Sequence, residues 1–140
     1  MSDGPARLRF PKELRLRGRK EFDRVFREGT RVRGRGILIV AARRDTGPTR
    51  IGLSVGRRYG GAVARNRIKR RLREAFRHDH ACLPDGLDLV VVPRTELGRT
   101  GFEDLRHLLT DGAKRALRLL ELAERKKRNA RPDSVAGKAP

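Results

Sequence analysis

The chain has 140 residues, with 36 Lys or Arg against 17 Asp or Glu, which gives a formal net charge of +19 at pH 7. This length favours one domain, no run of about 18 apolar residues is available to span a membrane, and the single cysteine, Cys82, excludes an intramolecular disulfide. The N-terminus lacks an apolar signal segment, so we expect a cytosolic protein. So large a positive charge opposes compaction and indicates a polyanionic partner, with nucleic acid as the first candidate.

The first predicted element is a helix from Arg19 to Glu28. Phe22, Val25 and Phe26 fall at positions i, i+3 and i+4, which places them on one helical face. Gly29 follows the last predicted turn, and we expect it to end the helix in a left-handed conformation.

Two strands are predicted next, from Ile37 to Ala42 and from Arg50 to Val55. The segment Asp45-Thr46-Gly47-Pro48 between them has the composition of a turn, so we expect the two strands to pair as a hairpin. A short additional strand is predicted near residues 30–33.

A second helix is predicted from Ala62 to His78, because Ile68, Leu72 and Phe76 recur at a spacing of four residues. After a Pro-Asp-Gly turn, the run from Leu87 to Val92 is almost entirely apolar. Such a run predicts a strand buried on both faces, central in its sheet and with a parallel neighbour.

The last helix is predicted to begin at the capping box of Thr100 and Glu103 and to end near Ala123. Residues 124–140 are basic and poor in apolar side chains, so we expect a basic disordered tail there.

The predicted organisation is a mobile segment at residues 1–12, one domain at 13–123, and the tail at 124–140. The order of helices and strands predicts an α+β fold, a two-layer α/β sandwich of a mixed sheet and three helices.

The second helix carries the strongest functional signal. At 100° per residue, five residues fall between roughly 100° and 200° from Ile68 and form one contiguous basic face; they are Asn66, Lys69, Arg70, Arg73 and Arg77. Arg67 lies on the opposite flank, and Arg65 lies at the edge of the apolar stripe, where its stem can pack while its head reaches a phosphate. A solvated helix face usually mixes both signs, whereas here seven cations accompany only Glu74 and Asp79. The pattern therefore favours contact with nucleic acid.

The loop before this helix supports the same interpretation. It contains Arg57, Arg58 and three glycines, and it can bring backbone N–H groups close to a phosphate at the helix N-terminus. It is not a nucleotide-binding P-loop, because no GxxxxGK[ST] sequence occurs.

Three blocks of sequence resemble the protein component of bacterial ribonuclease P. The longest runs from Arg50 to Phe76 and contains the family's Arg-Asn-Arg motif as Arg65-Asn66-Arg67. The segments from Arg19 to Gly29 and from Asp88 to Arg94 look like the family's first helix and its apolar strand. Together the blocks cover about residues 13–120 in consistent order.

The resemblance implies a fold with a left-handed β-α-β crossover. It also implies a function as the protein subunit of a ribonucleoprotein endonuclease that removes the leader of precursor tRNA. In this family the active site and its Mg²⁺ ions are carried by the partner RNA, while the protein binds that RNA and the single-stranded leader. No protein-bound cofactor, no obligate protein partner and no membrane contact is expected.

The resemblance assigns RNA contact to the region of the Arg-Asn-Arg motif. With the loop arginines and the basic face, the expected RNA-binding residues are Arg57, Arg58, Arg65, Asn66, Arg67, Lys69, Arg70 and Arg73. From spacing alone, core packing is the favoured role of Phe22 and Phe26. The resemblance instead matches them to the aromatic residues of the family's leader cleft, where rings can stack on bases. The strand at Ile37 lacks the aromatics that the family often has there, which leaves stacking to these two phenylalanines.

Other interpretations of the sequence are weaker. His78, His80 and Cys82 lack the spaced ligand pairs of a zinc site, and the carboxylates of residues 81–112 are more typical of caps and turns than of a nuclease site. The alternative function is a non-catalytic RNA-binding protein of similar fold that associates with the ribosome, and a third is an architectural protein for double-stranded DNA.

Overall fold

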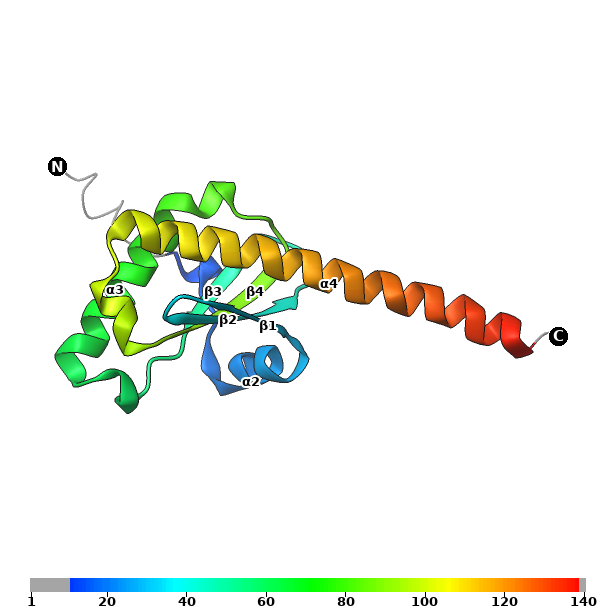
Figure 1. The fold of residues 1–140 in the computed structure, drawn as a ribbon, viewed down its shortest axis with the longest axis horizontal. Coiled ribbons are helices and arrows are strands. Elements are labelled where there is room, and N and C mark those ends of the chain that lie inside the picture. The colour runs from blue at the N-terminus through cyan, green and yellow to red at the C-terminus, as the bar shows by residue number, and fades with distance from the viewer. Residues whose placement is uncertain (1–10, 139–140) are drawn as a thin grey trace.

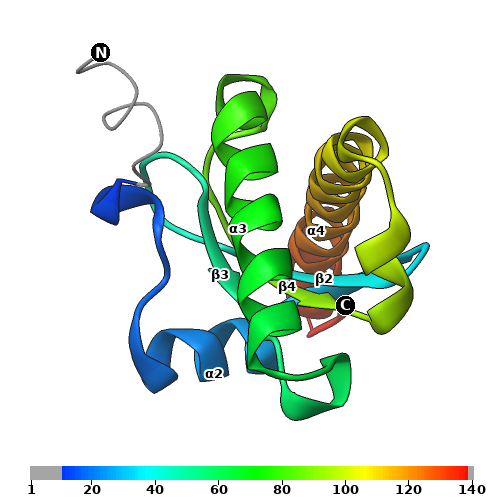
Figure 2. The same ribbon diagram turned by 90° about the vertical axis from the view of Figure 1, so that its left-hand side faces the viewer.

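The structure, a computed structural model, describes residues 11–138, with side chains described through residue 130. Four strands form one mixed sheet in the order β1-β2-β4-β3; they are β1 (Thr30–Gly34), β2 (Ile37–Arg43), β3 (Arg50–Leu53) and β4 (Leu87–Pro93). Three α-helices pack on the sheet, α2 (Gly18–Glu28), α3 (Ala62–Asp79) and α4 (Phe102–Lys138). The α+β class is confirmed, with α3 and α4 on one face and α2 on the other (Figures 1 and 2).

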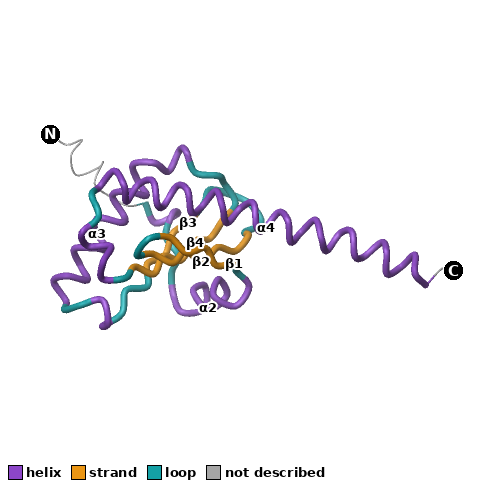
Figure 3. The backbone as a smooth tube through the Cα atoms, viewed as in Figure 1, coloured by secondary structure: helices purple, strands orange, loops and turns teal. Residues whose placement is uncertain are grey.

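Strand β4 occupies the centre of the sheet, as its apolar run predicts. It pairs antiparallel with β2 and parallel with β3, and its residues from Leu87 to Val91 are buried. The β3–α3–β4 segment is therefore the β-α-β unit that the resemblance implies. Figure 3 shows the strands gathered between the helices.

The predicted hairpin of the second and third strands is wrong. Strand β2 pairs with β1, from Thr30 opposite Ala41 to Gly34 opposite Ile37, and with β4 on its other side. Four of the seven residues of β2 in a row, Ile39 to Ala42, are buried, and a strand so apolar on both faces needs a neighbour at each edge. The connecting turn is the two-residue Arg35-Gly36, with Gly36 at φ 71°, as tight hairpins favour.

Alternate residues of the sheet supply two separate cores. Toward α3 and α4, the side chains of Ile39 and Leu89 pack with Ile68, Leu72 and Phe76 of α3. Toward α2, a smaller core joins Val25 of the helix to Val40 and Val90 of the sheet. Each strand residue therefore faces either the large core or the α2 side, and this alternation determines which side chains line each surface.

Gly29 does not adopt the left-handed conformation expected of it. Its φ is −82° and its ψ is 162°, which is extended backbone. Its role is close approach, because a Cβ at this position would lie 2.5 Å from the carbonyl oxygen of Val25 and 2.8 Å from that of Ala41. The glycine lets the end of α2 contact β2 directly.

Helix α4 differs from its prediction at both ends. It begins at Phe102, one residue later than a cap at Thr100 would place it, and it continues through Lys138, where a tail disordered from residue 124 was expected. Leu, Ala, Glu, Lys and Arg dominate residues 117–128, and all are strong helix formers. A low content of apolar residues removes a packed core but does not by itself end a helix.

The chain before α2 lies along the edge of β3. Residues Lys12–Leu14 form a 3₁₀ turn, η1, and the backbone N–H of Leu16 donates to the carbonyl of Ile51 at 2.9 Å. Of the segment predicted to be mobile, residues 1–12, residues 1–10 lie outside the described residues, and Lys12 belongs to η1. No helix between residues 11 and 138 combines the length and apolar character needed to cross a bilayer.

Candidate nucleic-acid interface

Helix α3 is held to the sheet by one face and presents cations on the other. Ile68, Leu72, Ala75 and Phe76 are each at most 1% exposed, so the rotation of the helix is fixed. The first turn of α3 contains no acidic residue, so its positive helix dipole is not offset there. Because the apolar face is buried against the sheet, the predicted basic face lies on the solvent side of the helix.

Six of the eight predicted RNA-binding residues are exposed, namely Arg57, Arg58, Asn66, Arg67, Arg70 and Arg73. The other two, Arg65 and Lys69, are half-buried. The Nη1 of Arg65 donates to the carbonyl of Gly60 at 2.7 Å, which ties this side chain to the loop that precedes the helix. Arg65 is thus placed to hold the loop in position beside the cations of α3.

That loop is itself ordered by packing. Residues Arg57–Tyr59 form a short 3₁₀ turn, η2, and Gly60 has a φ of 156° that an L side chain rarely adopts. The hydroxyl of Thr95 donates to the carbonyl of Tyr59 at 3.3 Å, and burial raises the pKa of the Tyr59 phenol. Arg57 and Arg58 therefore project from a fixed turn.

Arg73 marks a place where positive charges crowd together. Its pKa is lowered, first by burial and then by the nearby Arg15 guanidinium. Arg15 belongs to the segment before α2 and pairs in a bridge with Ile51 of β3. The basic face of α3 therefore continues onto the N-terminal segment.

The N-terminal segment adds cations that sequence reasoning missed. A hollow of about 560 Å³ beside η1 is lined by five basic and two acidic residues, Lys12, Arg15, Arg17, Arg44, Arg50, Glu13 and Glu21. The available signal was the excess of positive charge in residues 1–35, but nothing in that sequence shows that η1 lies against β3.

Two cations of α3 serve the fold instead. Arg71 donates to the carbonyls of Gly98, at 3.3 Å, and Thr100, which fastens the chain before α4 to α3. Arg77, part of the basic face by its angle, donates to the Glu74 carboxylate at 2.6 Å. Their partners account for their positions without a nucleic acid.

A second surface lies between α2 and the sheet. Phe22 and Phe26 are half-buried and pack on the α2-side core together with the half-buried Leu38 and Val92. Leu38 lies opposite Val92 in the register of β2 and β4. These four side chains form an apolar floor that is in part open to solvent, which we call the α2 cleft.

Cations border the α2 cleft on the side of β1. Arg33 lies opposite Leu38 and Arg31 lies opposite Val40, and both arginines are exposed. Because paired residues share a face of the sheet, these guanidiniums stand on the same side as Phe22 and Phe26. Sequence reasoning missed them, although the alternation of Arg31, Val32 and Arg33 is typical of a strand with one charged face.

The two surfaces approach each other at the start of α3. In Figure 2 the first turns of α3 extend beyond the sheet to the level of α2. The loop that carries Arg57 and Arg58 leads from the end of β3 into this part of α3.

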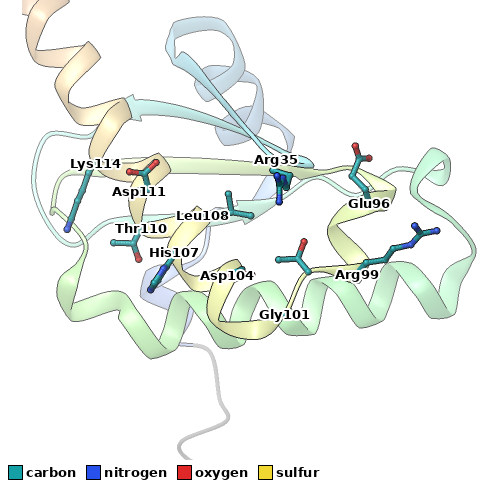
Figure 4. A pocket seen from close by; sticks show the side chains of 11 residues that line it. Arg35, Glu96, Arg99, Gly101, Asp104, His107, Leu108, Thr110, Asp111 and Lys114 are labelled. Carbon is teal, nitrogen blue, oxygen red and sulfur yellow. The ribbon is translucent and has the colours of Figure 1, made fainter.

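A larger hollow beside the first turns of α4 is lined by side chains of both charges. It measures about 1010 Å³, and Figure 4 shows side chains from α4, the η4 turn (Thr95–Arg99) and the turn before β2 around it. Arg35, Arg99 and Lys114 stand there with Glu96, Asp104 and Asp111. Equal numbers of opposite charges make it a poor site for a polyanion.

Three of the polar groups considered for catalysis or metal binding, His78, His80 and Asp88, have partners within the fold. His80 contacts the carbonyl of Thr49 at 3.2 Å, and His78 contacts the Asp79 carboxylate at 3.2 Å. Asp88 is fully buried and bound by Arg24 and Arg50. Within the described part of the chain, no group of three or more His, Cys, Asp or Glu side chains is placed to hold a metal ion.

Known proteins share this sequence and this arrangement. A family model described as Ribonuclease P matches residues 10–117. The ribonuclease P protein component of Thermotoga maritima is 34% identical over 110 residues, which are 76% of this chain and 94% of that protein. That of Desulfotalea psychrophila is 39% identical over 100 residues, which are 71% and 83%. The solved RNase P protein of Thermotoga maritima matches with a TM-score of 0.67 at 34% identity, over 72% of this chain and 96% of that one.

Proposed function

The chain belongs to the family of bacterial ribonuclease P protein components, and from this premise we propose that it binds the catalytic RNA and the leader of precursor tRNA. In this proposal the protein assists the endonucleolytic removal of the leader in the cytosol, and the reacting groups belong to the RNA. The observation that carries the proposal is the basic face of α3 beside the α2 cleft. One surface suits phosphates and the other suits the bases of a single strand.

The basic face of α3 contributes phosphate contacts. Arg67, Lys69 and Arg70 lie within the first three turns of α3 after the loop that Arg65 holds. Arginine donates to phosphate oxygens in a bidentate fork and lysine acts as a point charge. Contacts of this kind fix the register of an RNA without selecting its sequence.

The α2 cleft contributes contacts to bases. Phe22 and Phe26 supply ring faces, on which a base stacks with about 1–3 kcal/mol, and Arg31 and Arg33 supply charge for the backbone beside them. A leader of any sequence fits such a surface, because every base has a stacking face.

Mg²⁺ has its proposed place in the partner RNA. The two buried or nearly buried carboxylates nearest these surfaces, Asp88 and Asp79, are bound by arginines, so they do not fit the role of metal ligands. The part of this chain is to bring cations to the RNA and thereby lower the metal concentration that the RNA needs.

The test is cleavage of a precursor tRNA at low Mg²⁺ by the protein alone, by a bacterial ribonuclease P RNA alone, and by both together. We expect cleavage only with both, and a loss with Lys69→Ala and Arg70→Ala. Arg65→Ala is measured separately, because it also releases the loop at Gly60. The matched control is Arg99→Ala with Lys114→Ala, which removes two cations from the mixed-charge hollow.

Three outcomes contradict the proposal. Cleavage by rigorously purified protein alone would place the chemistry in its side chains. Tight RNA binding without stimulation would favour the non-catalytic, ribosome-associated RNA-binding protein. Tighter binding to double-stranded DNA than to either RNA would favour the architectural protein.

A further inference from the structure

Helix α4 extends beyond both the domain and the family. The family match ends at residue 117, whereas the helix continues to Lys138. Ala113 and Ala116 are fully buried, but Leu119 and Leu122, one turn later, are 44% and 49% exposed. Figures 1 and 3 show the last turns projecting away from the sheet. At about 1.5 Å per residue, the fifteen residues from Glu124 span about 22 Å.

The extension is anchored where it leaves the domain. Both carboxylate oxygens of Glu124 accept hydrogen bonds from Arg43 at the end of β2, at 2.8 Å from Nε and 3.2 Å from Nη2. This pair holds α4 against the end of β2, and the Arg43 guanidinium neutralises the Glu124 carboxylate. The direction of the extension is thus set by the sheet and not by the chain beyond it.

Four cations follow the anchor without interruption. Arg125, Lys126, Lys127 and Arg128 are all exposed, and at 100° per residue they encircle the helix. Among the described residues, no carboxylate lies within ion-pair distance of any of the four. Glu124 attracts Lys127 and Arg128, but its carboxylate is already bound by Arg43 and does not offset four neighbouring cations, so the arrangement favours an external anion.

The pattern discriminates among anionic partners. A helix that lies on a membrane needs an apolar face beside its cations, and no apolar residue larger than Ala occurs between residues 123 and 130. Recognition of single strands relies on aromatic stacking, and no Phe, Tyr or Trp follows Phe102. Cations on all sides of a rod instead suit the phosphates of paired RNA, whose backbone is contacted without base readout.

We propose that residues 125–128 of α4 form a second RNA contact, made to the phosphate backbone of a double-stranded segment of the partner RNA. The contact rests on the proposed function, because it assumes that the partner is RNA. It lies at the opposite end of the molecule from α3 (Figure 1), so the chain binds two separated parts of one RNA.

The test replaces all four cations by glutamine, which keeps the helix propensity high. Each phosphate contact on a duplex contributes about 0.9 to the slope of log K against log salt. We expect the variant to bind ribonuclease P RNA at least about tenfold more weakly at about 0.1 M salt, with a slope shallower by about 3–4. Circular dichroism confirms that the helix persists.

A matched pair of double variants controls for net charge. Lys126→Gln with Lys127→Gln removes two cations from the extension, and Lys114→Gln with Arg118→Gln removes two from the same helix where it covers the sheet. The first pair is expected to weaken binding more than the second. A short RNA hairpin is expected to show a larger loss than an unpaired RNA of equal length.

The outcomes separate this inference from the proposed function. If the unaltered chain neither binds ribonuclease P RNA nor stimulates cleavage, the proposed function fails. If it does both, but the Lys126 and Lys127 double variant matches the Lys114 and Arg118 double variant in affinity and salt slope, only the second contact is overturned. Loss of binding to mixed phosphatidylcholine and phosphatidylglycerol vesicles, with RNA affinity unchanged, would overturn it in favour of a membrane.

Discussion

Asp88 is the fully buried carboxylate that joins α2 to the sheet. Arg50 donates to it through Nε and Nη2, both at 2.8 Å, and Arg24 of α2 donates to it as well. Arg50 also reaches Glu21 at 3.2 Å. The buried Asp88 carboxylate therefore holds Arg24 and Arg50 close together, although their positive charges repel each other.

Asp88→Ala is expected to destabilise the fold by about 3 kcal/mol, near the lower end for a broken buried ion pair, because both guanidiniums partly reach solvent. Urea unfolding followed by circular dichroism measures the loss. A change below about 1 kcal/mol would show that the arginines find water or Glu21 instead.

Asp79 and Arg106 join α3 to α4 in a bidentate pair, with N–O distances of 2.9 and 3.0 Å. The hydrogen bond from Arg106 lowers the pKa of Asp79 below the usual range of an aspartate. A carboxyl whose pKa is depressed by folding stabilises the protein above its unfolded pKa, and this stabilisation is lost as pH falls through the folded pKa.

We therefore expect unfolding free energy to fall as the pH drops below about 4, and to fall less steeply in Asp79→Asn, which has no proton to bind. Glu124 shares the direction, since the hydrogen bond from Arg43 lowers its pKa, so Asp79→Asn removes only part of the slope. Thermal unfolding at a series of pH values measures this. If stability falls equally steeply below about pH 4 in the unaltered chain and in Asp79→Asn, the contribution of Asp79 to acid unfolding is contradicted.

At the residue level, exposure of the predicted site residues follows from helical periodicity, but their partners do not. The spacing of Ile68 and Leu72 orients α3, which is why most of the basic face is solvent-facing as expected. The bonds of Arg65 to Gly60 and of Arg71 to Thr100 depend on a loop and a turn that meet α3 only in three dimensions. Periodicity alone does not distinguish these cations, which bind backbone carbonyls, from cations that are available to bind RNA.

The packing of α2 on the sheet creates the α2 cleft, and it depends on Gly52. A Cβ on Gly52 would lie 2.6 Å from Cζ of Phe22 and 3.0 Å from the Cβ of Leu16. The ring of Phe22 thus rests directly on the backbone of β3. Phe26, one turn later, packs on the same core and is the ring more easily altered without displacing α2 from β3.

Phe26→Leu keeps an apolar side chain in the core and removes a stacking face. We expect weaker binding of precursor tRNA by about five- to tenfold, about 1–1.4 kcal/mol and within the range for one stacked base, with the affinity for leaderless tRNA unchanged. Binding of both RNAs to the complex of chain and catalytic RNA gives the comparison. An equal loss for both would indicate that Phe26 serves packing alone.

At the level of elements, the helices and strands follow from local pattern, whereas pairing does not. The turn chemistry of Asp45 to Pro48 is real, but it connects β2 to a strand on the far side of β4. Which strand lies between β2 and β3 depends on the burial of both faces of β4, whose residues come 38 positions after their partners in β3. The extension of α4 differs from the prediction for another reason. A segment with few apolar residues has no core to pack on, but it can still be helical when its residues are strong helix formers.

Two basic blocks of the molecule lie at opposite ends of the domain, and residues 1–60 carry a further net charge of +11. Residues 61–80, which contain α3, and residues 113–140, which contain the α4 extension, have net charges of +5 and +6, whereas residues 81–112 have −3. Repulsion within a chain of +19 opposes the compact state. Salt therefore acts in opposite directions on folding and on RNA binding.

The melting temperature is expected to rise as NaCl is raised from about 0.1 M to about 1 M, because the Debye length shortens from about 10 Å to about 3 Å. Over the same range RNA affinity falls. Differential scanning fluorimetry without RNA measures the first effect. A melting temperature that falls with salt would mean that ion pairs such as Asp79–Arg106 outweigh the repulsion.

The position of β4 in the sheet also determines when the protein acquires its shape during synthesis. The β1–β2 hairpin, β3 and all of α3 leave the ribosome before β4. Among the described residues, β3 pairs with β4 as its one neighbouring strand, and its other edge meets only Arg15 and Leu16 of the segment before α2. Until residue 93 has emerged, the cations of α3 belong to a segment with nothing to orient it. We expect chains that stop before Leu87 to be degraded rapidly by protease, and a nascent chain to become competent for its RNA only after the central strand is inserted between two strands made earlier.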